Sequence, residues 1–263
     1  MKKILAITTI CLVGCISVAV WFTRDQVTNL LNIDDLKVTT INVSFANIFL
    51  IERNDKLIMI DSGNPGHGSR IEAQIDKAGY DPKDIDYLIL THGHLDHSGT
   101  ARYFKDKYGM KIIGHAGDNE SFSTGKRMHV CPTNRTAKFF KSISGDIKID
   151  PFDVDILINE EYDLDQLGIS GKIIPWPGHT DGSIVIQFDD AVFVGDLIAG
   201  EPLSPQVPMT HFFMCDLEQN RQQIRRLLEK KEIKTWYLGH FGPLLPEAVE
   251  KYLISISNAG SST

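Results

Sequence analysis

Thr91-His92-Gly93-His94-Leu95-Asp96-His97-Ser98-Gly99 follows directly on Ile85–Leu90, a short and nearly continuous apolar run. Such a run predicts a strand covered on both faces, so the polar residues after it lie in a turn between a strand and a helix. Three imidazoles and one carboxylate fall within six residues of this turn. They are the donors that suit zinc, iron or manganese in proteins. We therefore predict a metal site at this end of the sheet, with a surface cluster of histidines as the alternative.

Three further candidate ligands occupy similar places along the chain. His179 lies between two predicted strands, Asp196 follows the predicted strand Ala191–Val194, and His240 follows the predicted strand Thr235–Leu238. Each is preceded by a glycine, which lets the backbone approach a site closely. Taken singly, each is more often an ordinary turn residue. The repeated placement at strand ends predicts that the three converge on one site with the histidine cluster.

At this point the chain resembles the metallo-β-lactamase-fold metallo-hydrolases, in particular their glyoxalase II and lactonase branches. The motifs His-x-His-x-Asp-His, Pro-Gly-His-Thr-x-Gly-Ser, Gly-Asp and Gly-His all appear in the family order between about residue 37 and the C-terminus. The resemblance implies an α/β fold, an αββα sandwich of two mixed β-sheets flanked by helices, with the site along one edge. By position it assigns a first metal to His92, His94 and His179, a second to Asp96, His97 and His240, and both to Asp196.

The same resemblance implies a metal-dependent hydrolase. Two zinc ions are the expected cofactors, with iron or manganese as alternatives. Two such ions can generate a metal-bound hydroxide that attacks a carbonyl group, and Asp96 is expected to hand a proton to the leaving group. Two other functions are compatible with the motifs: a mononuclear iron sulfur dioxygenase of the same fold, and a non-catalytic metal-binding protein.

The aspartate at position 196 narrows the expected substrate. True β-lactamases of this fold commonly have Cys or Ser there. The aspartate of this chain resembles instead that of the glyoxalase II, lactonase and ribonuclease Z branches. Only 23 residues follow His240, so the glutathione-binding helical domain of glyoxalase II is expected to be absent. We expect a small-molecule ester, thioester or lactone as substrate. His211 is a candidate for contact with it, and Phe212 and Phe213 form either an apolar wall for an acyl chain or part of the core.

The charge is unevenly distributed. The chain holds 27 basic and 34 acidic residues, a formal charge of −7, and this acidic balance excludes a nucleic-acid binder held by phosphate contacts. Residues 1–24 contain Lys2, Lys3 and Arg24 and no acid, so the rest of the chain carries −10. The ribonuclease Z branch is therefore disfavoured.

The N-terminal segment is predicted to enter a membrane. Ile4–Phe22 is a run without a formal charge that would span roughly 28 Å as a helix, close to the ~30 Å hydrocarbon core of a bilayer. The lysines before it predict a single-span anchor with the domain outside the cytoplasm. Leu12-Val13-Gly14-Cys15 resembles a lipobox, so a lipoprotein attached at Cys15 is the alternative.

We divide the chain into a signal or anchor segment at 1–24, a linker at 25–36 and the domain at 37–263. The polar stretch 117–150 is predicted to be irregular, which in a compact domain usually marks a functional or mobile segment. Cys131 and Cys215 lie outside the anchor. An oxidising compartment would permit them to pair, and two separate buried thiols are the alternative.

Overall fold

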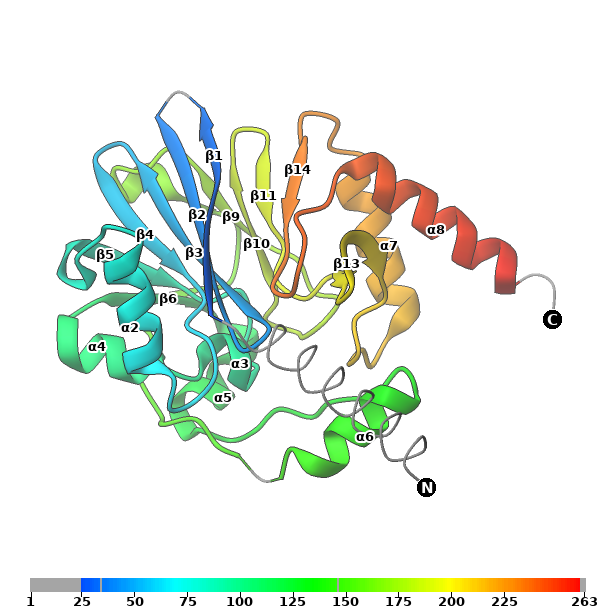
Figure 1. Ribbon diagram of the computed structural model, residues 1–263, viewed down its shortest axis with the longest axis horizontal. Coiled ribbons are helices and arrows are strands. Elements are labelled where there is room, and N and C mark those ends of the chain that lie inside the picture. Colours follow the sequence, from blue (N-terminus) through cyan, green and yellow to red (C-terminus); the bar gives the residue numbers. More distant parts are fainter. Residues whose placement is uncertain (1–24, 34, 146, 261–263) are drawn as a thin grey trace, which may run out of the picture.

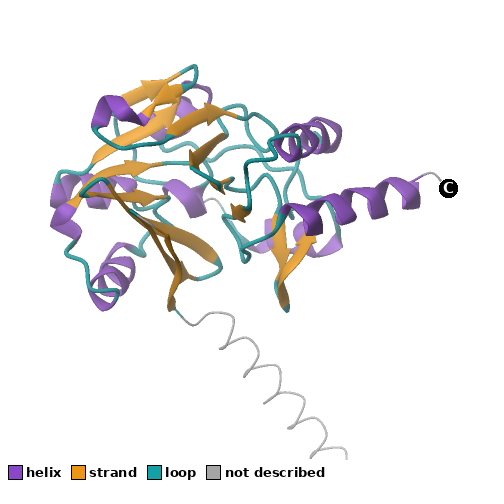
Figure 2. Cartoon of the chain, turned by 90° about the horizontal axis from the view of Figure 1, so that it is seen from above, coloured by secondary structure: helices purple, strands orange, loops and turns teal. Residues whose placement is uncertain are grey.

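The computed structural model describes residues 25–33, 35–145 and 147–260, which form two packed sheets with helices on their outer faces (Figures 1 and 2). The predicted anchor, residues 1–24, lies outside this range. Within the range, no helix combines the length and the apolar character needed to cross a membrane.

The first sheet is mixed. Its first half is an antiparallel meander and its second half is parallel, because helices connect the later strands. In spatial order the strands are β1 (Gln26–Ile33), β2 (Leu36–Val43), β3 (Ala46–Arg53), β4 (Lys56–Ile60), β5 (Ile85–Ile89), β6 (Lys111–His115) and β7 (Ile156–Ile158).

The second sheet is also mixed, and a separate two-stranded ribbon accompanies it. The sheet runs in the order β14 (Thr235–Tyr237), β11 (Ala191–Phe193), β10 (Ile184–Phe188), β9 (Lys172–Pro175) and β8 (Tyr162–Asp163), with only β14 and β11 parallel. The ribbon pairs β12 (Ala199–Glu201) with β13 (Ser204–Met209).

Seven α-helices and three short 3₁₀ turns lie in the described part of the chain. They are α2 (Gly68–Lys77), α3 (Leu95–Ser98), α4 (Ala101–Tyr108), α5 (Asn119–Thr124), α6 (Arg135–Ile143), α7 (Leu217–Leu228) and α8 (Pro246–Gly260), with η1 (Pro82–Asp84), η2 (Ala116–Asp118) and η3 (Leu164–Leu167). Figure 1 shows α2 and α4 beyond the first sheet and α7 and α8 beyond the second.

Three buried clusters define the layers. The first lies between the sheets, where Phe49 of β3 meets Phe193 of β11 with ring centroids 4.9 Å apart. The second packs α2 and α4 against the first sheet, and the third packs α7 and α8 against the second. Side chains alternate between layers along each strand: in β4, Ile58 faces the other sheet and Met59 faces the helices. The expected αββα sandwich is therefore confirmed.

Two expectations about irregular segments are wrong. The linker expected at 25–36 contains β1, which pairs antiparallel with β2 and so extends the sheet. The stretch 117–150 contains α5 and α6, and the side chain of Asn134 caps α6 by accepting a hydrogen bond from the backbone N–H of Ala137. The first segment is stabilised by pairing with the next strand, and the second by a helix cap.

Cys131 and Cys215 form a disulfide, so the first of the two alternatives holds. Their loops also join through the backbone, since Met214 donates to the carbonyl of Cys131 at 2.8 Å and Thr133 donates to that of Phe212 at 2.9 Å. The disulfide thus fastens the start of α6 to the segment that follows β13.

The inter-sheet cluster yields a stability prediction. Phe193 is fully buried, stacked on Tyr237 at 4.7 Å and in edge contact with Phe49. We expect Phe193→Ala to lower the free energy of unfolding by about 3–5 kcal/mol, because it leaves a cavity between the sheets. Phe139→Ala, at a side chain that is 60% exposed, should change it by less than about 0.5 kcal/mol. Urea denaturation measures both, and equal losses would contradict the assigned core.

Candidate metal centre

All the predicted ligands converge at one edge of the sandwich. His92 and His94 follow β5 in the turn that leads into α3, and Asp96 and His97 lie in α3 itself. His179 lies between β9 and β10, Asp196 follows β11 and His240 follows β14. Parallel neighbours such as β11 and β14 end at the same edge, so residues after them are brought together although they are distant in sequence.

The first group of donors is His92, His94 and His179. His94 Nδ1 lies 3.2 Å from His92 Nε2 and 2.8 Å from His179 Nε2. With Asp196 these donor atoms all lie within 4.8 Å of one another. Two nitrogens bound to one tetrahedral zinc are about 3.3 Å apart, so the spacing fits a single small cation.

The second group is Asp96, His97 and His240. The Nε2 atoms of His97 and His240 are 3.4 Å apart, and His240 Nε2 lies 3.3 Å from Asp96 Oδ2. Asp196 stands between the two groups: its Oδ2 is 3.6 Å from His179 Nε2 and 3.3 Å from His240 Nε2. One carboxylate therefore faces both groups of donors.

Asp61 orients two of the imidazoles. It lies directly after β4, accepts hydrogen bonds from the backbone N–H and the hydroxyl of Thr91, and lies 2.7 Å from His97 Nδ1. The Thr91 oxygen in turn lies 3.0 Å from His92 Nδ1. Acceptors on the Nδ1 side place the proton there and leave the Nε2 lone pair toward the site. His240 is held in the same way, with Nδ1 2.9 Å from the carbonyl of Phe45.

Asp118 ties two ligand loops together. Its carboxylate accepts hydrogen bonds from the backbone N–H of Gly93 at 2.7 Å, from that of Gly182 at 2.9 Å, and from the Thr180 hydroxyl at 2.7 Å. Burial raises the pKa of Asp118, and these donors partly offset it. The loop that carries His94 and the loop that carries His179 thus share one buried anchor.

Glycine next to a ligand is a steric requirement here. A Cβ on Gly239 would lie 2.3 Å from Asp196 Oδ1 and 2.6 Å from His97 Cε1. Gly195, before Asp196, has a φ of +52°, a conformation that favours glycine, and a Cβ there would meet Thr91 at 2.8 Å. The prediction that glycines allow close approach at these strand ends is confirmed.

The first group is electrically neutral. Burial lowers the pKa of His92 and His179 well below the ordinary value, and neighbouring imidazoles lower it further. Burial also lowers the pKa of His94 to about 4. The three imidazoles therefore carry free lone pairs at neutral pH, as ligands require.

The second group behaves differently. Burial lowers the pKa of His97 and His240, but nearby carboxylates outweigh it. Asp196, Asp61 and Asp96 raise the pKa of His97 well above its ordinary value, and Asp196 with Asp96 raises that of His240 to about 10. Without a metal these two imidazoles are protonated at neutral pH, and a divalent cation would replace their protons.

The donor set fits divalent metal binding. Asp196 is 2% exposed, and its Oδ1 accepts no well-aligned hydrogen bond from the described residues, although His97 Nε2 lies 3.3 Å away. Buried polar atoms normally have well-placed partners, so a carboxylate oxygen left without one among imidazoles indicates a site for a cation.

His211 is closer to this centre than the sequence indicates. Its Nε2 lies 3.1 Å from Asp196 Oδ2, and with Asp196 and His240 it forms a further group of possible ligands. Like the recognised ligands, it comes after a strand, here β13. The β12–β13 ribbon is not predicted from the sequence. Asp61 and Asp118 are also missed, although Asp61 follows a strand as the recognised ligands do.

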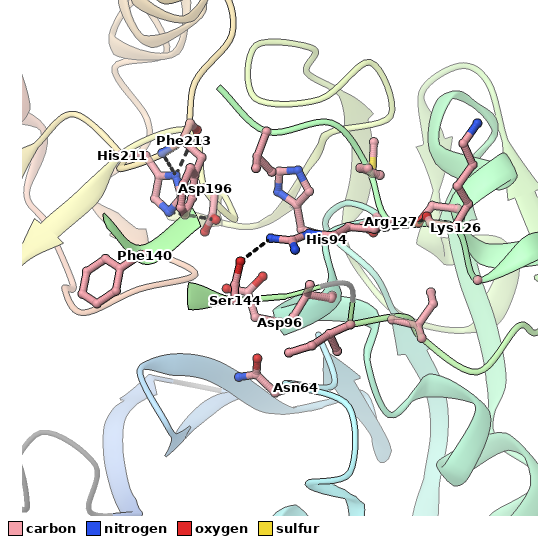
Figure 3. A pocket seen from close by; sticks show the side chains of 18 residues that line it. Asn64, His94, Asp96, Lys126, Arg127, Phe140, Ser144, Asp196, His211 and Phe213 are labelled. Carbon is pink, nitrogen blue, oxygen red and sulfur yellow. Dashed lines mark hydrogen bonds and ion pairs between the residues drawn. The ribbon is translucent and has the colours of Figure 1, made fainter. Parts of the chain in front are cut away.

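A cavity of about 150 Å³ opens beside the second group. His94, Asp96, Asp196 and His211 point into it, and Arg127 extends across it to donate a hydrogen bond to Ser144 (Figure 3). Its other walls are largely apolar and include Leu95, Met128, Val130, Phe140, Ile147, Ile149 and Phe213. Of the two aromatic residues considered for an apolar wall, Phe213 lines this pocket.

The chain is similar in sequence to two hydroxyacylglutathione hydrolases. The chain is 32% identical over 171 residues to the hydroxyacylglutathione hydrolase GloC of Haemophilus influenzae, covering 64% of this chain and 72% of that protein. It is 26% identical over 158 residues to the hydroxyacylglutathione hydrolase of Pelagibacter ubique, covering 59% of this chain and 52% of that protein. The match therefore spans about half the length of the Pelagibacter enzyme.

Solved structures agree on the fold. BJP-1, a subclass B3 metallo-beta-lactamase of Bradyrhizobium japonicum, matches with a TM-score of 0.62 at 17% identity, covering 92% of this chain and 94% of that chain. A metallo-beta-lactamase of Cronobacter sakazakii matches with a TM-score of 0.60 at 17% identity, covering 86% and 90%. The model of the metallo-beta-lactamase superfamily matches residues 41–240. With this match and a histidine and aspartate centre suited to a divalent metal, the chain belongs to the metallo-beta-lactamase superfamily.

Proposed function

We propose that this chain is a metallo-hydrolase that holds two zinc ions and cleaves the carbonyl carbon–heteroatom bond of a small ester, thioester or lactone. The observation that carries the proposal is the carboxylate of Asp196, which faces both groups of donors at 3.3–3.8 Å. Imidazole and carboxylate donors suit zinc. Two bound ions would supply Lewis acidity and a hydroxide nucleophile at neutral pH.

The thioester option is supported by the relatives. The Haemophilus protein is a hydroxyacylglutathione hydrolase, and an acylglutathione is a thioester. The pocket supports a small acyl group, since its walls beside the donors are apolar. Arg127 lies across this pocket and forms no ion pair with a described carboxylate, so it would favour a substrate with an anionic group.

We assign to Asp96 the proton transfer to the leaving group. Asp96 lines the pocket, and its Oδ2 lies 3.3 Å from His240 Nε2. Burial raises its pKa, but the charges of His97 and His240 outweigh burial and hold it below the ordinary value. An ionised Asp96 first accepts a proton from the attacking water and then donates it to the departing group.

Removing the shared carboxylate tests the site. We expect Asp196→Ala to reduce zinc from two ions per chain to one or none and to lower kcat/KM by at least about 100-fold, because both groups lose a common ligand. Asp181→Ala removes an exposed carboxylate from the loop that carries His179 and should change neither quantity. Elemental analysis and turnover on a panel of esters, thioesters and lactones measure both.

Full metal occupancy with normal turnover in Asp196→Ala would contradict the shared-ligand assignment. One iron per chain with oxygen consumption on a sulfur substrate would replace the hydrolase proposal by the dioxygenase. Tight zinc binding without turnover on the whole panel would leave a metal-binding protein.

The two groups should bind metal with different pH dependence. His97 and His240 have raised pKa values, so a cation at their group displaces about two protons near neutral pH, and its affinity rises with pH. The imidazoles of the first group have lowered pKa values and release almost none. Zinc titration by calorimetry in buffers of different ionisation enthalpy separates the two steps. Equal heats in all buffers would refute the assigned protonation states.

The role of Asp96 is tested by the leaving group. We expect Asp96→Asn, assayed at saturating zinc, to slow an alkyl ester about 10- to 100-fold more than a thioester, because an alkoxide needs a proton to depart and a thiolate does not. Equal slowing of both substrates would show that Asp96 acts only as a ligand.

We also retain the membrane tether as a proposal. It rests on the uncharged run Ile4–Phe22 and the flanking residues Lys2, Lys3 and Arg24.

A further inference from the structure

Helix α6 presents an apolar stripe to solvent. Phe139 and Ile143, one turn apart, are 60% and 63% exposed, and Phe140 beside them is 44% exposed. Ile147, past the end of the helix, is 46% exposed. Ala137, on the other side of the helix, is buried against the body of the protein. Large apolar side chains that protrude together from a helix mark an interaction surface.

Cations lie on the helix and next to it. Arg135, Lys138, Lys141 and Lys148 are all exposed, and none forms an ion pair with a carboxylate in the described part of the chain. Residues 126–148 hold six Lys or Arg against one Asp, a formal charge of +5 in a chain of −7. The positive charge is therefore concentrated on the apolar helix and its flanks.

The helix is held firmly in this position. The disulfide Cys131–Cys215 fixes the segment before it, and the Asn134 side chain caps its first turn. Lys141 Nζ donates to the carbonyl of Val130 at 2.7 Å, and Arg127 donates to Ser144 Oγ at 2.8 Å just past its end. Its exposed face is thus part of a fixed surface.

α6 also borders the pocket. Phe140 and Ile147 contribute to the pocket wall, and Phe140 is in edge contact with Phe212 at 5.9 Å. Figure 1 shows α6 at the edge of the sandwich, apart from the helices that cover the two sheets. A binding partner of α6 would therefore lie next to the pocket.

Charge decides which occupant suits this surface. The N-terminal segment carries Lys2, Lys3 and Arg24 without an acid, so it would repel the cations of α6. A second copy of α6 would bring the same positive charges face to face. An anionic lipid surface matches both properties, because basic residues bind its headgroups and protruding apolar side chains enter the acyl region.

We propose that α6 docks on an anionic lipid surface, with Phe139 and Ile143 inserted and the neighbouring cations Arg135 and Lys138 on the headgroups. Docking brings the mouth of the pocket to the lipid–water boundary, where an amphiphilic substrate would concentrate. The inference goes beyond the proposed function and needs neither metal nor turnover, so its failure would leave the hydrolase proposal unaffected.

Tryptophan quenching tests the docking. In the full-length protein, the substitution Trp21→Phe first removes one of the three tryptophans. The buried Trp176 and Trp236 remain as background fluorescence. Phe139→Trp places a probe on α6, and Ile254→Trp places a matched probe on α8, where the side chain is 57% exposed. Both proteins are mixed with vesicles of brominated phosphatidylcholine, with and without phosphatidylglycerol.

We expect phosphatidylglycerol vesicles to quench the Phe139→Trp protein roughly threefold more than the Ile254→Trp protein. Adding Arg135→Glu and Lys138→Glu should remove about half or more of that quenching, as should high salt. Equal quenching of the two probes would overturn the proposal. Quenching that does not depend on phosphatidylglycerol would also overturn it, because it would indicate a purely apolar contact. A blue shift of the tryptophan emission without lipid, growing with protein concentration, would overturn it too, because it would indicate contact with a second copy of the chain.

Discussion

One carboxylate, that of Asp196, faces five imidazoles in a buried site. Its oxygens lie within 3.8 Å of ring nitrogens of His92, His97, His179, His211 and His240. Burial keeps His92 and His179 neutral with their lone pairs free, whereas the carboxylates keep His97 and His240 protonated. A divalent cation would bind the free lone pairs and replace the two protons, so the site is suited to a charge that the chain itself does not carry. The glycines beside the ligands let the donor atoms approach one another closely, and Asp118 holds two of the ligand loops in place.

The strands that bring these ligands together could be predicted largely from local pattern. The apolar run Ile85–Leu90 and the strand ends before Asp196 and His240 mark the edge correctly because burial leaves a clear signature in sequence. Strand β1 could not be found in the same way, since its place depends on pairing with β2 and its sequence lacks strict alternation. Likewise α6 has few buried side chains, so its pattern resembles that of a polar loop.

The ligands that could be predicted from the sequence are those that belong to a motif of recognisable spacing. Asp61 and Asp118 are single aspartates, and their roles arise from hydrogen bonds to residues about 30 and 60 positions away. No local spacing carries that information. His211 was singled out as a pocket residue, but its distance to Asp196 depends on the β12–β13 ribbon, whose pairing is visible only in three dimensions.

Asp61 makes the two halves of the centre interdependent. Its carboxylate lies 2.7 Å from His97 in the second group and, through the Thr91 hydroxyl, positions His92 in the first. It also adopts a φ of +61°, which an aspartate holds only when its surroundings fix it. Because one residue orients His97 in the second group and His92 in the first, the orientations of these two rings are coupled. The backbone after β4 therefore helps to specify the centre as a single unit, although it contributes no ligand.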